Sequence, residues 1–148
     1  MIQKTLLPEM KTFDPLTDIE NVNLILDQGN WPNFHDSEVH FLNLWRGDIR
    51  PDDQVWIGPV IEATFELCAL RKPYFVVLKF HDCVSVKLQE FNHQNALYDL
   101  SFNYEARGTY LDRRPLPPYI CVTFEQEVGA SLSFKCFRIE ALERKEKN

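Results

Sequence analysis

Hydrophobic and polar residues alternate along most of the chain with the two-residue period of a β-strand. In the clearest segment, residues 60–70, apolar side chains occupy the odd positions from 61 to 67 and polar side chains the even ones. Residues 74–80 are almost entirely apolar, which is typical of a central strand. The pattern predicts about seven strands, at residues 37–46, 60–70, 74–80, 84–89, 98–105, 120–124 and 132–141.

The last of these segments changes phase near its middle. Phe134 and Cys136 lie on one face, whereas Ile139 and Ala141 lie on the other. One extra residue reverses the facing set, so we expect a β-bulge near Cys136 and Phe137. The connections between strands are mostly too short for crossover helices, which predicts a largely antiparallel sheet.

A helical pattern occupies residues 18–28. Thr17 and Glu20 have the spacing of a capping box, and Gly29 is a typical residue to end the helix. Its apolar residues fall on one face, so the helix should pack on the sheet; they are Ile19, Val22, Ile25 and Leu26. We therefore expect an α+β domain with one N-terminal helix on a curled antiparallel sheet, or, as the alternative, a β-sandwich.

Length and composition favour one domain spanning residues 1–148. A chain with 45% hydrophobic and 13% aromatic residues is not typical of disordered proteins. Residues 1–15 show no clear period and residues 143–148 are charged, so both ends are expected to be irregular or frayed. The chain starts without a signal-peptide pattern and has no apolar run that could span a bilayer. These features predict a soluble, cytoplasmic protein with no membrane partner.

Cysteines occur at four positions, and each lies in an apolar, strand-like run. None belongs to a CxxC pair, and a chain with this much potential core does not need a disulfide framework. We expect the following to be buried free thiols: Cys68, Cys83, Cys121 and Cys136.

The net charge of −6 is unevenly distributed. Residues 9–66 hold twelve acidic side chains and, as bases, only Lys11, Arg46 and Arg50. This window would repel nucleic acid and would attract a basic protein. The commoner reason for excess acid is solubility, and that interpretation stays open.

Two polar clusters stand out, at residues 30–39 and 91–95. The first combines Trp31 and Phe34 with His35 and Asp36 where the helical pattern gives way to a strand. We expect a structural corner in which the aromatic rings anchor the chain and the polar groups satisfy the backbone. We further expect the second cluster to join the first in a buried polar network, with members Trp31, Phe34, His35, Asp36, Asn92, His93, Gln94 and Asn95.

The same polar residues allow an enzymatic alternative. His35, Asp36, His81 and His93 could in principle gather around zinc or iron, although their spacing is not that of a preformed metal site. There is no nucleophile-elbow motif and no glycine-rich phosphate loop. The sequence therefore predicts no catalytic residues, no metal and no cofactor.

At these clusters the sequence resembles the Immunity protein 50 family of bacterial polymorphic-toxin systems. The resemblance rests on residues 30–39, 91–95 and 134–140, and it spans roughly residues 28–142. It implies a small α+β protein that binds a secreted toxin in the cytoplasm of the cell that makes both, and that is an inhibitor rather than an enzyme. The acidic window fits a basic, nuclease-like toxin.

Under this hypothesis the partner contacts are exposed acids and an aromatic residue outside the core. The candidates are Glu38, Asp48, Asp52, Asp53, Trp56, Glu62 and Glu66. The alternatives are the metal-dependent enzyme and a stand-alone structural or oligomerising domain without a toxin.

Overall fold

A computed structural model describes residues 11–47 and 58–147 of the chain. Helix is limited there to α1 (Pro15–Asp18) and the 3-10 turn η1 (Val22–Leu24). The strands are β1 (Glu38–Trp45), β2 (Val60–Glu66), β3 (Tyr74–His81), β4 (Val84–Gln89), β5 (Ala96–Glu105), β6 (Tyr119–Val128), β7 (Ser131–Cys136) and β8 (Arg138–Glu146). The described part is mainly β, so the expected α+β class fits only loosely.

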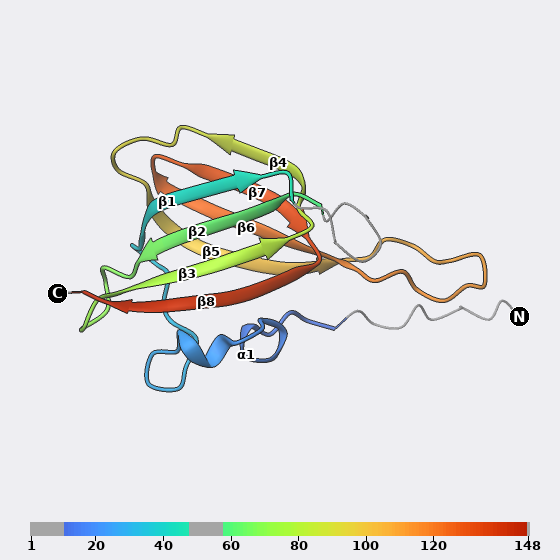
Figure 1. The fold of residues 1–148 in the computed structure, drawn as a ribbon, viewed down its shortest axis with the longest axis horizontal. Helices are drawn as coiled ribbons and strands as arrows, with labels where there is room; N and C mark the ends of the chain where they lie inside the picture. The colour runs from blue at the N-terminus through green and yellow to red at the C-terminus, as the bar shows by residue number, and fades with distance from the viewer. Residues whose placement is uncertain (1–10, 48–57, 148) are drawn as a thin grey trace, which may run out of the picture.

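These strands form one open sheet in the order β4-β7-β6-β5-β1-β2-β3-β8. Every neighbouring pair among the described strands is antiparallel, as the short connections predicted. The sheet curls into two layers, which we call the front layer (β1, β2, β3, β8) and the back layer (β4, β7, β6, β5) (Figure 1). The layers join where β1 meets β5, at the single pair of Glu38 and Ala96.

The chain also crosses between the layers at two bends. β3 continues into β4 through Asp82, which has a φ of 57°, and β7 continues into β8 through Phe137. The two bends lie side by side, because the backbone N–H of Phe137 donates to the carbonyl of His81 at 3.1 Å. Side chains are buried up to Cys136 in one phase and from Ile139 in the other, so the phase change lies where the sequence predicted it. The expected β-bulge within one strand is wrong, however, because the chain breaks there into β7, which pairs with β6, and β8, which pairs with β3.

Aromatic rings from both layers meet in the core. Phe65 of β2 lies 5.3 Å from Phe124 of β6, and Phe80 of β3 lies 4.9 Å from Phe134 of β7 (ring centroids). All four rings are at most 3% exposed. Burial of large aromatic area on facing strands is what holds the two layers together.

The predicted helix over residues 18–28 is wrong. Asn21 has a left-handed φ of 59°, which interrupts a helix. The backbone of Glu20 instead pairs with β8: its N–H donates to Ile139 at 2.9 Å, and its carbonyl accepts from Ala141 at 2.8 Å. The edge of β8 thus offers the hydrogen bonds that a helix would have supplied. Gly29 lies in a tight turn between Asp27 and Asn30.

The apolar face of that segment was nevertheless identified correctly. Ile19, Val22 and Ile25 are buried, and Leu26 is half-buried against the core. We call residues 11–37 the N-terminal segment. Phe13 of this segment stacks on Phe102 of β5 at 5.0 Å, so the segment contacts the back layer, while Glu20 holds it to β8 of the front layer. The segment with α1 lies below β8 in Figure 1 and covers that side of the core.

The C-terminal end differs from the expectation, whereas residues 11–14 at the other end belong to no helix or strand. Residues 143–146 belong to β8, and Glu146 pairs with Tyr74, so the charged end is ordered sheet rather than a frayed tail. At the other end, α1 begins at Pro15 and is capped by the Asp14 carboxylate, which accepts from the Leu16 N–H at 3.0 Å.

The four cysteines, all within the described residues, are free thiols. Cys83 and Cys136 are buried, as expected, whereas Cys68 is exposed and Cys121 is half-buried. No helix in the described part of the chain has the length and apolar character needed to cross a membrane.

Candidate functional site

The first polar cluster forms the bend that leads into β1. Trp31 packs against Phe34 at 5.2 Å and against Phe102 at 5.8 Å, and Phe34 is 2% exposed against Phe65. These contacts join the N-terminal segment to both layers, because Phe65 belongs to β2 and Phe102 to β5.

His35 and Asp36 serve this bend in different ways. The Nδ1 atom of His35 lies 2.7 Å from the carbonyl oxygen of Tyr98, so the imidazole supplies a hydrogen bond to this backbone carbonyl. Asp36 adopts a left-handed φ of 62°, and its backbone N–H donates to Leu97 at 2.8 Å. Its carboxylate is exposed instead of bonding the backbone, which differs from the role expected for it.

The second cluster is organised around Asn95, which is 3% exposed. Its side-chain oxygen accepts from the backbone N–H of Asn92 at 2.9 Å and of Ala130 at 3.0 Å, and its amide nitrogen donates to the carbonyl of Asn92 at 2.6 Å. The side chains of His93 and Gln94 are exposed, so they lie outside this network. Their solvent exposure follows from their position at the tip of the turn.

The two clusters meet through Glu38. Its Oε1 atom accepts from the backbone N–H of Asn95, and the N–H of Val39 donates to the Asn95 carbonyl at 2.9 Å. Glu38, proposed above as a partner contact, is therefore half-buried and engaged in the corner. A hollow of about 240 Å³ beside it is lined by Val39, His40, Phe91 and other residues of both clusters.

The other proposed partner contacts are only partly available. Glu66 is 9% exposed and accepts from Lys147 at 2.5 Å, His40 at 3.2 Å and Cys68 at 3.1 Å. The Lys147 ammonium group is the main cause that lowers the pKa of Glu66. Glu62 is half-buried between Asn43 and Lys79. The remaining candidates lie outside the described residues: Asp48, Asp52, Asp53 and Trp56.

A different group of acids gathers beside the corner, and we call it the acidic patch: Asp36, Asp99, Glu125 and Glu127. Asp99 of β5 and Glu125 of β6 are direct neighbours in the sheet register. All four carboxylates are exposed. Within the part of the chain that the structure describes, the only side chain that forms an ion pair with them is His35, whose Nε2 lies 3.4 Å from Asp36.

The crowding of like charges changes the ionisation of the patch. Asp36 raises the pKa of Glu127, mainly through a shared hydrogen bond. The hydrogen bond to the Tyr98 carbonyl raises the pKa of His35, and Asp36, Glu127 and Asp99 add to this shift. The ring of Tyr98 lies edge-on to His35 at 5.2 Å and is 59% exposed.

Sequence reasoning missed three of these four acids. Asp99, Glu125 and Glu127 lie outside the acidic window at residues 9–66. The alternating pattern placed Asp99 on a polar face, but only the strand pairing reveals that Glu125 is its neighbour.

The histidines proposed for a metal site are dispersed. His81 lies 3.1 Å from Glu140 of β8, whereas His35 faces Tyr98 and His93 is exposed. Among residues 11–47 and 58–147 there is no group of three or more His, Cys, Asp or Glu that could hold a metal ion.

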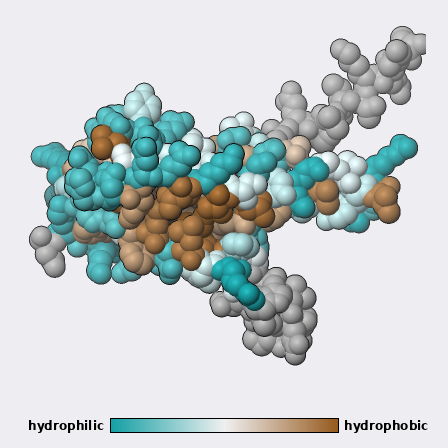
Figure 2. Space-filling model, turned by 90° about the horizontal axis from the view of Figure 1, so that it is seen from above, coloured by the Kyte–Doolittle hydropathy of each residue, from teal (hydrophilic) through white to brown (hydrophobic). Residues whose placement is uncertain are grey.

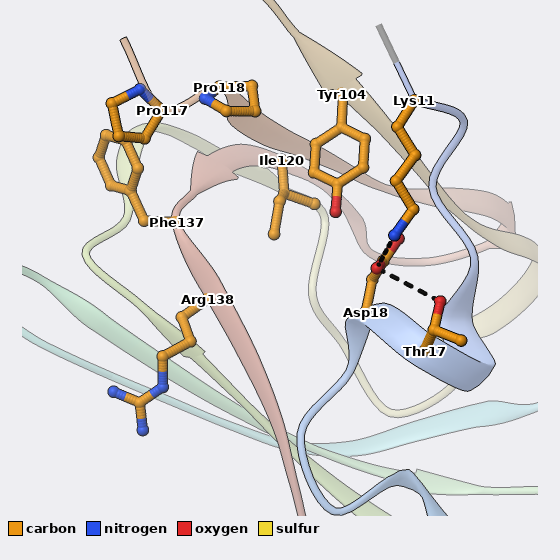
Figure 3. A pocket seen from close by; sticks show the side chains of 9 residues that line it. All are labelled: Lys11, Thr17, Asp18, Tyr104, Pro117, Pro118, Ile120, Phe137 and Arg138. Carbon is orange, nitrogen blue, oxygen red and sulfur yellow. Dashed lines mark hydrogen bonds and ion pairs between the residues drawn. The ribbon is translucent and has the colours of Figure 1, made fainter.

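A hollow of about 800 Å³ opens between the N-terminal segment and the bend at Phe137 (Figure 3). Its polar groups bind each other: Asp18 accepts from Lys11 at 2.7 Å and from Thr17 at 3.3 Å. Burial and Asp18 raise the pKa of Tyr104, which points into the hollow, to about 12. The lining residues are Lys11, Thr17, Asp18, Tyr104, Pro117, Pro118, Ile120, Phe137 and Arg138.

Apolar side chains are also exposed on the strands at the top of Figure 1. Val84, Val86 and Leu88 of edge strand β4 are 37–40% exposed, and Phe41 and Leu44 of β1 are 53% and 42% exposed. Figure 2, which views the molecule from this side, shows a brown band across the middle of the surface.

No family model, no curated protein and no solved structure matches this chain.

Proposed function

We propose that this protein is a cytoplasmic immunity protein, which binds and neutralises a basic protein toxin made by the same cell. The observation that carries the proposal is the acidic patch, in which Asp36, Asp99, Glu125 and Glu127 lie together on the surface. Among the described residues, only His35 forms an ion pair with them. The resemblance of residues 30–39 and 91–95 to immunity proteins supports the same function.

Uncompensated carboxylates repel one another, so their arrangement costs stability unless a partner neutralises them. A basic partner would relieve the repulsion between Asp36 and Glu127. Complementary charge of this kind speeds the encounter of two proteins and selects the partner.

The patch also has an apolar component that suits a protein partner. Tyr98 is 59% exposed, and its ring lies 5.2 Å from His35, which pairs with Asp36. Tyrosine is enriched at the centre of protein interfaces, where its ring supplies contact area and its hydroxyl group a hydrogen bond. Tyr98 is therefore the expected anchor, with the acids as its polar rim.

The first experiment expresses the product of the neighbouring gene with and without this protein and measures cell survival. Survival that depends on this protein, together with a complex isolated from the two purified chains, is the expected result. A neighbouring product that is harmless, or a toxin that kills equally in both cases, would overturn the proposed function.

The second experiment tests the patch within that complex. Asp99→Asn with Glu125→Gln should lower the association rate about tenfold at low salt, because two steering charges are lost. The matched control is Glu90→Gln with Glu143→Gln, which removes the same charge from exposed sites outside the patch. Equal rates for the two double variants would assign the toxin to another surface.

A further inference from the structure

A second hollow, of about 520 Å³, lies on the side of the molecule where the N-terminal segment meets β8. It is formed by three distant parts of the chain: Asp27 and Gln28, the turn residues Arg71 and Lys72, and Arg144 of β8. All five lining side chains are polar, and three of them are cationic in a protein of net charge −6. We call it the cationic hollow.

Arg144 is held in place from several directions. Its Nη1 atom donates to the Leu26 carbonyl at 3.0 Å, and its Nε donates to Glu146 at 2.6 Å. Its guanidinium group lies 3.7 Å from the centre of the Tyr74 ring, and the Tyr74 hydroxyl in turn donates to Ile25 at 2.8 Å. A guanidinium group carries five N–H donors in one plane, so most of the fork remains available to a ligand.

Arg71 and Lys72 lack such partners. Both are exposed, and within the described residues neither forms a hydrogen bond or an ion pair. Their turn is closed at its base, where the N–H of Leu67 donates to the Tyr74 carbonyl at 3.0 Å. The turn therefore presents two unneutralised cations toward Arg144, and Asp27 is the only acid in the lining.

We propose that the cationic hollow binds a phosphate-type oxyanion. A planar guanidinium fork matches two oxygens of such a group. Arg71 and Lys72 add two positive charges, which offset Asp27 of the lining and the Glu146 carboxylate that pairs with Arg144. The group can belong to free phosphate or to the head group of an anionic lipid, since both present the same oxygens. This site is independent of toxin binding, because it involves no residue of the acidic patch.

The test titrates the full-length protein with inorganic phosphate and follows backbone amide and arginine side-chain signals by NMR. We expect saturable shifts confined to residues 27–28, 71–72 and 144. Arg71→Gln with Lys72→Gln should weaken binding about tenfold, because two charge-assisted contacts are lost. The control, Arg113→Gln with Arg114→Gln, removes an adjacent pair of exposed cations from another loop and should bind as the wild type does.

A second experiment distinguishes free phosphate from a lipid head group as the ligand. The protein is sedimented with phosphatidylcholine vesicles that contain or lack phosphatidic acid. Phosphatidic-acid-dependent sedimentation that requires Arg71 and Lys72 identifies a lipid head group, whereas phosphate binding without sedimentation identifies a free anion. The proposal is overturned if phosphate causes no saturable shift in this hollow, or if the Arg71/Lys72 double variant binds as tightly as the control.

Arg144→Lys provides a further check on geometry. It keeps the charge but removes the fork, so it should weaken phosphate binding while the Arg71 and Lys72 signals still respond. Arg144 also contacts Tyr74 and Leu26, so the substitution could affect folding. The melting temperature of the Arg144→Lys variant verifies that the variant is folded. Unchanged affinity in a folded Arg144→Lys variant would contradict bidentate recognition.

Discussion

The side-chain oxygen of Asn95 accepts the backbone N–H of Ala130 at 3.0 Å, which ties the turn before β5 to the turn before β7. The same oxygen accepts from Asn92, and the Asn95 backbone contacts both Glu38 and Val39 of β1. One buried amide thus connects three segments that are far apart in the sequence. Asp36 of the acidic patch lies at the same corner, where its backbone N–H donates to Leu97, two residues after Asn95.

Asn95→Ala should therefore be strongly destabilising. The substitution leaves the buried N–H of Ala130 without an acceptor, and an unsatisfied buried donor costs about 1–3 kcal/mol in addition to the lost bonds. We expect a loss of about 2–4 kcal/mol in the free energy of unfolding, measured by urea denaturation. Gln94→Ala is the control, because the Gln94 side chain is exposed and should change stability by less than about 0.5 kcal/mol. Equal stability of both variants would contradict the role of Asn95.

Gly129 and Gly29 form a matched pair for testing how tightly this corner packs. Their φ angles are 82° and 81°, but a Cβ atom on Gly129 would lie 2.1 Å from the Gln94 carbonyl oxygen, whereas Gly29 faces open space. Gly29→Ala should cost about 1–2 kcal/mol, which is the strain of a left-handed alanine. Gly129→Ala should cost at least about 2 kcal/mol more, because backbone must also move.

Thermal unfolding of both glycine variants measures the difference. If Gly129→Ala were no more destabilising than Gly29→Ala, the close approach of residues 94–95 to Gly129 would be wrong. The comparison separates packing from backbone strain because the two glycines have nearly the same φ angle.

Much of this fold could be predicted from alternation alone. The strands from β1 to β6 lie where the two-residue period placed them, and the phase change at Phe137 marks the bend between β7 and β8. This works because each strand buries one face, and period-two burial leaves a direct trace in the sequence.

The helix over residues 18–28 could not be rejected in the same way. Ile19, Val22 and Ile25 have helical spacing and are buried, yet the chain is mostly irregular there. The deciding interaction is the pairing of Glu20 with β8, which comes from 120 residues farther along the chain at Glu140. Local propensity is a weak prior when a distant strand edge offers backbone hydrogen bonds.

The candidate sites also differ in how much of them the sequence reveals. Trp31 to Asp36 and Asn92 to Asn95 stood out as clusters because unusual residues are adjacent in the sequence. The acidic patch and the cationic hollow each combine residues from several segments, so neither leaves a local signal. The acidic patch depends on the register of β5 with β6, and the cationic hollow depends on the position of Arg144 beside the turn at Arg71.

The acidic patch predicts an unusual pH dependence of stability. The pKa of Glu127 is raised in the folded state, so folding is favoured by protonation of Glu127 and this contribution is lost as the pH rises through the folded-state pKa. Glu127→Gln should therefore raise the melting temperature at pH 7, where Glu127 and Asp36 repel each other. Below the ordinary carboxyl value of 4.5 the difference should disappear, since the wild-type carboxyl is then neutral too.

Melting temperatures measured from pH 3 to pH 8 test this prediction, and Glu143→Gln is the control because Glu143 is an exposed acid of β8 outside the patch. A Glu127→Gln effect that is constant across the range, or that grows toward low pH, would contradict the repulsion between Glu127 and Asp36.

Cys68 and Cys121 provide the last prediction, because each thiol donates a hydrogen bond to a different carboxylate. Cys68 lies 3.1 Å from Glu66, and Cys121 lies 3.1 Å from Glu105. Partial desolvation and the hydrogen bond to the neighbouring carboxylate raise the pKa of both thiols to about 11. The thiolate is the reactive form, so both cysteines should react slowly with iodoacetamide at pH 8. Glu66→Gln should speed alkylation of Cys68 severalfold and leave Cys121 unchanged, and Glu105→Gln should do the reverse.

Mass spectrometry resolves the two sites, while Cys83 and Cys136, which are at most 1% exposed, should stay unmodified until the protein unfolds. Equal acceleration of all four cysteines in either variant would indicate general loosening of the fold instead of local control of the thiol pKa.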